Sequence, residues 1–206
     1  MTAKSLRIRA LAVAAVLSVT LAPAVLAQPV PDTPQFDASG RMAFPANYRD
    51  WVFLSSGMDM SYTQAPEMAD QHMFNNVFVQ RFAYEAFRKT GVWPDGTILM
   101  LEARGGASKG SINKRGVFQT GEIMGLEAHV KDTARFTGGW AFFGFGGAGV
   151  PAQQIPYAAA CYSCHQAHAA ADTTFVQFYP TLLPIATKLG TLSAPYLAET
   201  APAKGQ

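Results

Sequence analysis

The sequence of 206 residues has no stripe of basic residues and, after its first 27 residues, no apolar run long enough to span a membrane. The first absence argues against nucleic-acid binding, and the second argues against a membrane span in the mature chain. Residues 1–27 hold three of the 16 lysines and arginines and none of the 14 acidic residues. The remaining chain therefore has 13 basic and 14 acidic residues, a net charge of −1.

Long helices are missing as well. The 18 glycines and 13 prolines leave no room for four long heptad-patterned helices, which excludes a four-helix bundle. Segments rich in aromatic and β-branched residues predict strands instead, at residues 51–54, 73–80, 97–103, 117–121, 123–130 and 140–145. Helices are predicted over residues 81–90, around the cysteines, and over 173–188, where Pro180 and Pro184 interrupt. The predicted fold class is α+β, mainly β, with an antiparallel sheet flanked by short helices.

The N-terminus has the three parts of a secretory signal peptide. Lys4, Arg7 and Arg9 precede an apolar stretch over residues 10–25, and small residues up to Ala27 offer a cleavage site. A membrane anchor is the alternative, but it would need about 20 apolar residues without a cleavage site. We therefore expect residues 1–27 to be removed on export to the periplasm.

Cysteine is almost absent, and its two copies lie together in the run Cys161-Tyr162-Ser163-Cys164-His165. The C-x-x-C-H spacing is typical of covalent haem c attachment near the C-terminus of the chain. Cys161 and Cys164 would form thioether bonds to the haem vinyl carbons, and His165 would supply the proximal nitrogen to iron. Since bacteria attach haem c outside the cytoplasm, this motif and the signal peptide are consistent with each other.

Two other interpretations of the motif remain open at this point. A structural disulfide or thioredoxin-like pair also uses C-x-x-C, but it does not require the histidine that follows. A zinc site could combine Cys161, Cys164, His165 and His168, although tetrahedral zinc sites normally take ligands from two separated segments.

Methionine is absent after His165. Small electron-transfer cytochromes usually have the haem motif near their start and a methionine ligand downstream, so a histidine–methionine carrier is disfavoured. Methionines 58, 60, 68, 73, 100 and 124 all precede the motif and are expected to fill the core.

Several short runs occur in a fixed order ahead of and beyond the motif. They are NYRDWV at 47–52, NVFV at 76–79, TGVWPDGT at 90–97, GLEA at 125–128, VKD at 130–132, RF at 135–136, WAF at 140–142 and FVQFYPTL at 175–182. Together they resemble the cytochrome P-460 family over roughly residues 40–185. The resemblance implies a mostly β fold, a homodimer and a five-coordinate haem. Proline and polar residues at 28–38 and 194–206 separately predict flexible segments, which would flank a haem domain over residues 39–193.

Two branches of that family differ at one position. Members that oxidise hydroxylamine carry a lysine cross-linked to the haem, directly before a glutamate, and here that position is Leu101 followed by Glu102. Leucine cannot form this bond. Relatives without the cross-link, called cytochrome c′-beta, bind nitric oxide and carbon monoxide at an apolar distal face.

The same resemblance assigns two more residues to the haem pocket. Glu127 falls where the hydroxylamine-oxidising members have a pocket carboxylate, and Asn75 falls where they have a distal arginine. A buried carboxylate with a raised pKa could act as a general base on hydroxylamine. The alternative from the strand pattern is that Glu127 and His129 belong to a solvated face.

Other side chains are weaker candidates for the iron. His72, His129 and His168 are the remaining histidines, and none is preferred as a sixth ligand. Lys109 and Lys114 could replace the missing cross-linking lysine, but they lie in a glycine- and serine-rich loop at 105–116 and are expected to be exposed.

The sequence thus predicts an exported c-type cytochrome with one haem and an open iron position that binds nitric oxide or carbon monoxide. The alternatives are a hydroxylamine-oxidising enzyme that uses Glu127 and a periplasmic electron carrier with a redox partner.

Overall fold

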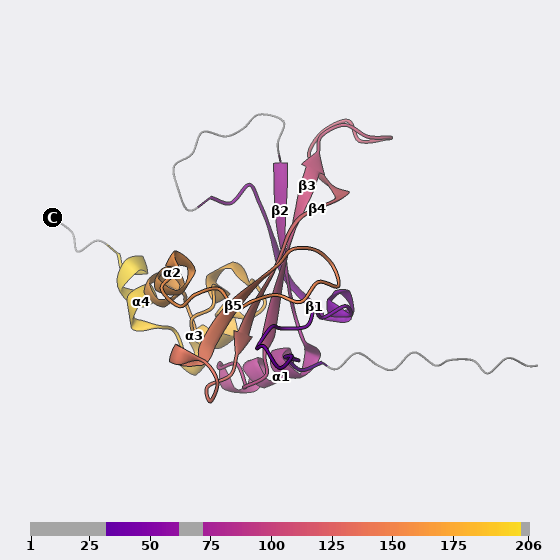
Figure 1. Ribbon diagram of the computed structural model, residues 1–206. Coiled ribbons are helices and arrows are strands. Elements are labelled where there is room, and N and C mark those ends of the chain that lie inside the picture. Colours follow the sequence, from indigo (N-terminus) through magenta and orange to yellow (C-terminus); the bar gives the residue numbers. More distant parts are fainter. Residues whose placement is uncertain (1–31, 62–71, 203–206) are drawn as a thin grey trace, which may run out of the picture.

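A five-stranded antiparallel sheet forms the centre of the molecule (Figure 1). The computed structural model describes residues 32–61 and 72–202, so the predicted signal peptide lies outside the described residues. Each strand pairs with the next one along the chain, in the order β1 (Val52–Met58), β2 (His72–Val79), β3 (Ile98–Ala107), β4 (Phe118–Lys131) and β5 (Trp140–Phe145). Four short helices accompany them: α1 (Arg81–Thr90), α2 (Ala160–His168), α3 (Leu183–Leu189) and α4 (Ala194–Thr200). The predicted fold class is confirmed.

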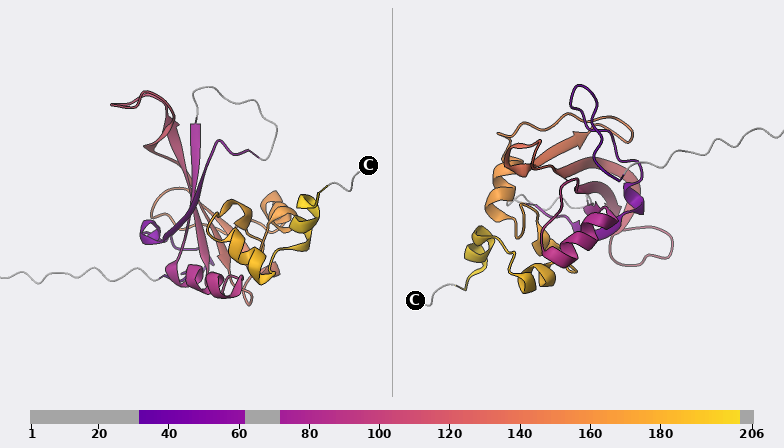
Figure 2. Two further views of the ribbon diagram at one scale, coloured as in Figure 1. Left: turned by 180° about the vertical axis from the view of Figure 1, so that it is seen from behind. Right: turned by 90° about the horizontal axis from the view of Figure 1, so that it is seen from below.

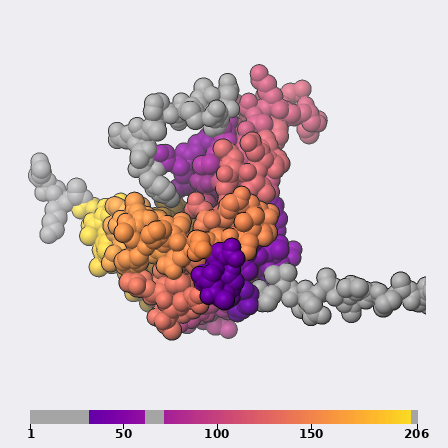
Figure 3. All heavy atoms as spheres, in the orientation of Figure 1, coloured from indigo at the N-terminus to yellow at the C-terminus, as the bar shows by residue number. Residues whose placement is uncertain are grey.

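The strands are longer than predicted where they approach the β3–β4 turn. The segments predicted at 117–121 and 123–130 are one strand, β4, because its pairing with β3 continues through a shift of register near Arg104. The predicted loop at 105–116 begins only after Ala107 for the same reason. In the space-filling view the turn end of these two strands projects beyond the body of the molecule (Figure 3).

Helix α1 has the boundaries that its sequence predicts. It ends at Gly91, whose backbone is left-handed with φ of 71° and whose N–H donates to the carbonyl of Phe87 at 2.7 Å. A glycine adopts this conformation without steric cost, which explains why the helix ends there.

The alternation of side chains along the strands divides the apolar residues between two faces. On one face, Met100, Val130 and Phe143 pack against the N-terminal residues Met42 and Tyr48. On the other face, a second group of buried residues packs with helices α1 and α3 and the C-terminal segment: Leu54, Val79, Phe87, Trp93, Leu99, Trp140, Val176, Tyr179, Leu182 and Ala186. The C-terminal helices gather on one side of the sheet, as the view from behind also shows (Figure 2).

The C-terminal region is less helical than predicted. Residues 173–188 form only a short 3-10 helix, η3 (Val176–Phe178), and all of α3 except its last residue. Pro184 lies in the first turn of α3, where its missing N–H leaves no helix bond unmade, so it begins the helix instead of interrupting it. Within the described residues no helix is long and apolar enough to cross a membrane.

The two segments that the sequence predicts to be flexible, residues 28–38 and 194–206, both contain residues with defined contacts. Phe36 bridges to Met42 and packs on Phe143, with ring centroids 5.8 Å apart. Helix α4 begins after Ser193, whose side-chain oxygen accepts a hydrogen bond from the backbone N–H of Tyr196. These aromatic and capping contacts are why the ordered fold extends beyond residues 39–193.

Candidate functional site

A cavity of about 730 Å³ lies between one face of the sheet and the segment that runs from α2 to η3. Its volume falls in the range that small-molecule and cofactor sites occupy. Mostly apolar and aromatic side chains line it, together with the C-x-x-C-H motif and a few polar groups. They include Met60, Met73, Asn75, Val77, Leu99, Leu101, Met124, Glu127, His129, Phe142, Cys161, Cys164, His165, Phe175, Phe178 and Tyr179. All six site residues that the sequence singled out therefore reach this one cavity.

Helix α2 carries the C-x-x-C-H motif on the cavity wall. Cys161 and Cys164 lie three residues apart, so they share one side of the helix, and both are free, partly buried thiols. Tyr162, between them, is buried, and its hydroxyl donates to the carbonyl of Ile155 at 2.9 Å and accepts from the N–H of Phe142 at 3.3 Å. These bonds fasten the motif to β5 while the two sulfur atoms stay at the cavity.

His165 is held in one orientation by a backbone carbonyl. Its Nδ1 lies 2.8 Å from the oxygen of Thr173. A carbonyl oxygen only accepts hydrogen bonds, so Nδ1 carries the proton and Nε2 keeps its lone pair. Burial lowers the pKa of His165, although the Thr173 carbonyl acts in the opposite direction. The ring is therefore neutral near neutral pH, which is the state that a metal requires.

His129 lies beside His165 and is also buried. Its ring stacks on Phe142 with centroids 4.0 Å apart and meets His165 edge to face at 4.9 Å. Burial, followed by the nearby His165, holds the pKa of His129 well below its usual range. Its Nε2 has no hydrogen-bond partner among the described residues. An unpaired buried nitrogen at a cavity wall fits a site that another group completes.

The sheet supplies an apolar wall with one carboxylate in it. Leu101 on β3 pairs with Val77 on one side and with Glu127 on the other, so the three side chains lie on the same face. Asn75 follows on that face of β2, opposite Ala103.

The interpretation of Glu127 and His129 as a solvated outer face is wrong for His129, which is 7% exposed. Glu127 does face the cavity, but its side chain is exposed, so the hypothesis of a buried carboxylate is not matched. The alternation along β4 correctly paired the two residues on one face. It could not tell which side of the sheet the C-terminal helices cover.

The other histidines lie elsewhere. Nδ1 of His72 is 2.7 Å from a carboxylate oxygen of Asp59, and Nδ1 of His168 is 3.1 Å from one of Glu199. Neither lines the cavity. His129 does line it, but its ring touches His165 directly, which leaves no space for a haem between the two rings. The part of the chain that the structure describes also holds no cluster of three histidine, cysteine or acidic side chains suited to a metal, which disfavours the zinc interpretation.

The methionines differ from expectation. Met100 is fully buried, but Met58 and Met124 are 49% and 55% exposed, and Met60, Met73 and Met124 line the cavity. Met68 lies outside the described residues. Methionine side chains thus line the cavity from β2, from β4 and from the residues just after β1, although no methionine follows the motif.

Sequence reasoning missed the aromatic part of the wall. Phe142, Phe175 and Phe178 line the cavity, and Phe175 lies 4.1 Å from His165 between ring centroids. Of these three, only Phe142 lies in a segment that the sequence predicts to be a strand. It pairs with His129, so the two side chains share the face of the sheet that lines the cavity. Lys109 and Lys114 are exposed, as expected, and do not line the cavity.

An antiparallel sheet that packs a C-x-x-C-H helix and a neutral histidine against an apolar cavity defines a cytochrome-like haem protein. A family model described as Cytochrome P460 matches residues 45–176, more than half of the chain. The chain belongs to the cytochrome P460 family, which confirms the resemblance and implies that the protein binds haem. A search of curated proteins finds none that matches it.

Proposed function

We propose that this protein is an exported c-type cytochrome whose single haem is bound covalently by Cys161 and Cys164, with His165 as axial ligand, and that it binds nitric oxide or carbon monoxide. One observation carries the proposal: the two thiols, the neutral histidine and the apolar Leu101 share a single cavity. When bound, the haem would supply an iron atom with one open coordination position for a small neutral ligand.

The cavity residues favour neutral diatomic ligands. Leu99, Leu101 and Val77 offer hydrocarbon and no hydrogen-bond donor. An anion would lose its hydration against these three side chains, which offer no compensating partner, at a cost of roughly 1–3 kcal/mol or more. Nitric oxide and carbon monoxide avoid this cost, because they carry no charge.

Oxidation of hydroxylamine is the second candidate, and the position of Glu127 favours it. The carboxylate lies on the cavity wall directly across from Leu101, where it could accept a proton from a bound substrate. Two features weigh against this candidate. Leu101 replaces the lysine of the hydroxylamine-oxidising members, and Glu127 is exposed rather than desolvated.

Nitric oxide titrations and hydroxylamine assays on the wild type and Glu127→Gln separate the two candidates. We expect both proteins to bind nitric oxide equally and neither to turn over hydroxylamine. Turnover by the wild type that is lost in Glu127→Gln would establish the second candidate instead.

Export and assembly belong to the same proposal. The signal peptide expected at residues 1–27 supports delivery to the periplasm, where haem c attachment takes place and a redox partner could reduce the iron. A homodimer is supported by large apolar side chains that are exposed, with Ile112 at 90%, Met124 at 55% and Met58 at 49%. The molar mass in solution, measured by light scattering, tests the dimer.

A further inference from the structure

The loop that presents the Thr173 carbonyl to His165 has an uncommon backbone. Asp172 and Thr173 both have left-handed dihedral angles, with φ of 48° and 54°, although neither is glycine. Side chains disfavour this conformation, so it persists only where surrounding contacts hold it. The loop is short, since Ala171 and Thr174 bridge to each other.

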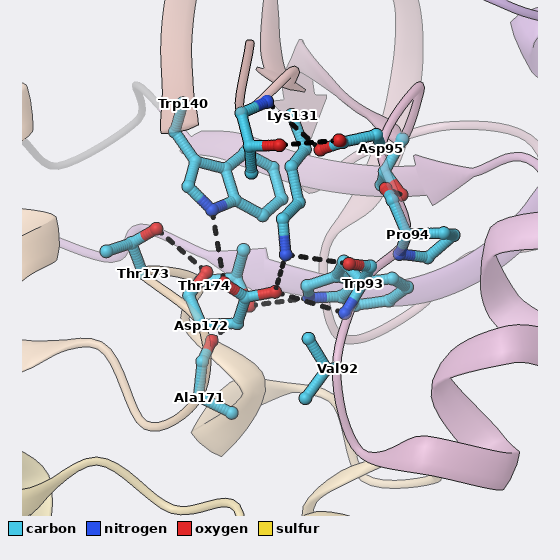
Figure 4. Close-up of polar contacts among 12 residues, drawn as sticks. Val92, Trp93, Pro94, Asp95, Lys131, Trp140, Ala171, Asp172, Thr173 and Thr174 are labelled. Carbon is cyan, nitrogen blue, oxygen red and sulfur yellow. Dashed lines mark hydrogen bonds and ion pairs between the residues drawn. The ribbon is translucent and has the colours of Figure 1, made fainter. Parts of the chain in front are cut away.

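Asp172 supplies most of those contacts (Figure 4). One carboxylate oxygen lies 2.6 Å from Nζ of Lys131 and accepts from the N–H of Trp93 at 3.1 Å. The other oxygen accepts from Nε1 of Trp140 at 3.3 Å. Lys131 lies at the end of β4 and Trp140 at the start of β5, so the carboxylate fastens the loop to the sheet.

A second set of bonds closes the arrangement (Figure 4). Nζ of Lys131 also donates to the carbonyl of Trp93 at 2.7 Å. Nε1 of Trp93 donates to the hydroxyl of Thr174 at 2.9 Å, and that hydroxyl donates to the carbonyl of Ala171 at 2.7 Å. These bonds join the two ends of the loop, Ala171 and Thr174, to each other and to Trp93, in addition to the contacts of Asp172.

The ion pair at the centre is shielded from water. The side chains of Lys131 and Asp172 are only 10% and 20% exposed. A charge at such a position is weakly screened, and removing one partner leaves the other uncompensated. The pair is thus the main fixed connection between the sheet and the two residues with left-handed backbone.

We propose that Lys131 and Asp172 are positioning residues that hold the Thr173 carbonyl against Nδ1 of His165 and thereby set how strongly His165 binds the haem iron. The inference rests on the proposed role of His165 as axial ligand. A histidine whose Nδ1–H donates to a fixed carbonyl is a stronger base at Nε2. If the loop relaxes, this bond lengthens, and the iron–histidine bond weakens.

The test uses the haem-loaded protein with Asp172→Asn and Lys131→Met. Asp172→Asn keeps the shape of the side chain and one oxygen acceptor but removes the charge. We expect both variants to lower the iron–histidine stretching frequency in resonance Raman spectra of the ferrous protein, and to make the reduction potential more positive. Because the two residues act as one unit, the double variant should shift both readouts no further than either single variant.

Asp37→Asn is the matched control. This carboxylate accepts from the backbone N–H and the hydroxyl of Ser39, at 2.9 and 2.6 Å, and its other side-chain partner is Arg41, so it contacts neither Lys131 nor the 171–174 loop. It should leave the frequency and the potential unchanged.

Trp140→Phe keeps the test decisive if the charge variants do not fold. It removes the bond from Nε1 to Asp172 but keeps an aromatic ring beside His129 and Lys131, and it should shift the frequency less, in the same direction. Wild-type frequency and potential in every haem-loaded variant would overturn the inference and leave the pair a purely structural ion pair. Wild-type protein without covalent haem would instead contradict the proposed function, so the two failures are distinguishable.

Discussion

Burial and one hydrogen bond act on the His165 ring in different ways. Burial among Phe142, Phe175 and His129 lowers its pKa and keeps the ring neutral, while the Thr173 carbonyl decides which nitrogen keeps the proton. Both effects prepare Nε2 for a metal before any metal is present. The packing of His165 thus supports its proposed role as ligand as much as the motif that contains it.

The two cysteines should have no substitute as attachment points. Cys161→Ser or Cys164→Ser should greatly reduce covalent haem in protein matured by a periplasmic attachment system, because a thioether requires a sulfur atom. Haem staining after denaturing electrophoresis measures this. Ser163→Ala, which changes an exposed side chain between them, is the control and should stain like the wild type. Undiminished staining in both cysteine variants would contradict the proposed attachment.

Leu101 should limit access to the iron. Leu101→Ala removes hydrocarbon from the cavity wall, so carbon monoxide should associate faster after flash photolysis. Leu189→Ala, on an exposed part of α3, is the matched control and should rebind at the wild-type rate. Equal association rates in all three proteins would show that Leu101 does not face the ligand.

At the scale of elements, the sequence predicted the parts that rest on short-range patterns. The end of α1 follows from Gly91, and β5 has the predicted bounds of residues 140–145 because four of its six residues are aromatic. The alternation along β4 also paired Glu127 with His129 correctly. In each case neighbouring residues in the chain contain the whole signal.

The parts that could not be predicted depend on contacts between distant segments. Met124 is exposed and lines the cavity because β4 extends past the body of the sheet, which no local pattern reveals. The 171–174 loop resembles an unremarkable polar turn in the sequence, and its left-handed residues are held by Lys131, some 40 positions earlier. Such features arise from tertiary packing, which the periodicity of apolar residues along the sequence does not predict.

The end of α1 gives a prediction at this scale. Gly91→Ala should lower the free energy of unfolding by about 1–3 kcal/mol, because φ is positive and the added carbon would overlap the side chain of Thr191. Gly146→Ala is the control, since its φ is not positive and no atom lies within 4 Å of the added carbon. Denaturant unfolding measures both changes. Equal stability of the two variants would mean that α1 does not need a left-handed residue at its end.

At the scale of the whole molecule, the sheet separates two layers of different character. A compact apolar core with the N-terminal segment closes one side of the sheet, and on the other side the cavity lies between the sheet and the C-terminal segment. The stability of the protein should therefore depend on ionisable groups that this second layer buries.

His129 is the strongest such group. Its folded-state pKa lies well below the ordinary value of 6.5, so the unfolded chain binds a proton first as the pH falls. The contribution of His129 to the free energy of unfolding is therefore fully present above about pH 6.5. Below that pH the free energy of unfolding should fall by up to about 1.4 kcal/mol for each pH unit, until the folded-state pKa is reached. Unfolding of the wild type and His129→Phe at several pH values measures the slope. His168→Gln, at an exposed position, should retain the wild-type slope, and an equal slope in His129→Phe would contradict this assignment.

The proposed open iron position is tested by the absorption spectrum of the ferrous protein, recorded before and after nitric oxide is added. We expect a five-coordinate, high-spin haem c spectrum that changes at once with the ligand, because His165 would be the one protein ligand and Leu101 forms no cross-link. Two results would contradict it. A six-coordinate, low-spin spectrum without added ligand would mean that a group such as Met60 or Met73 binds the iron and would favour electron transfer. A strongly red-shifted Soret band would mean that another residue is cross-linked to the haem and would favour hydroxylamine oxidation.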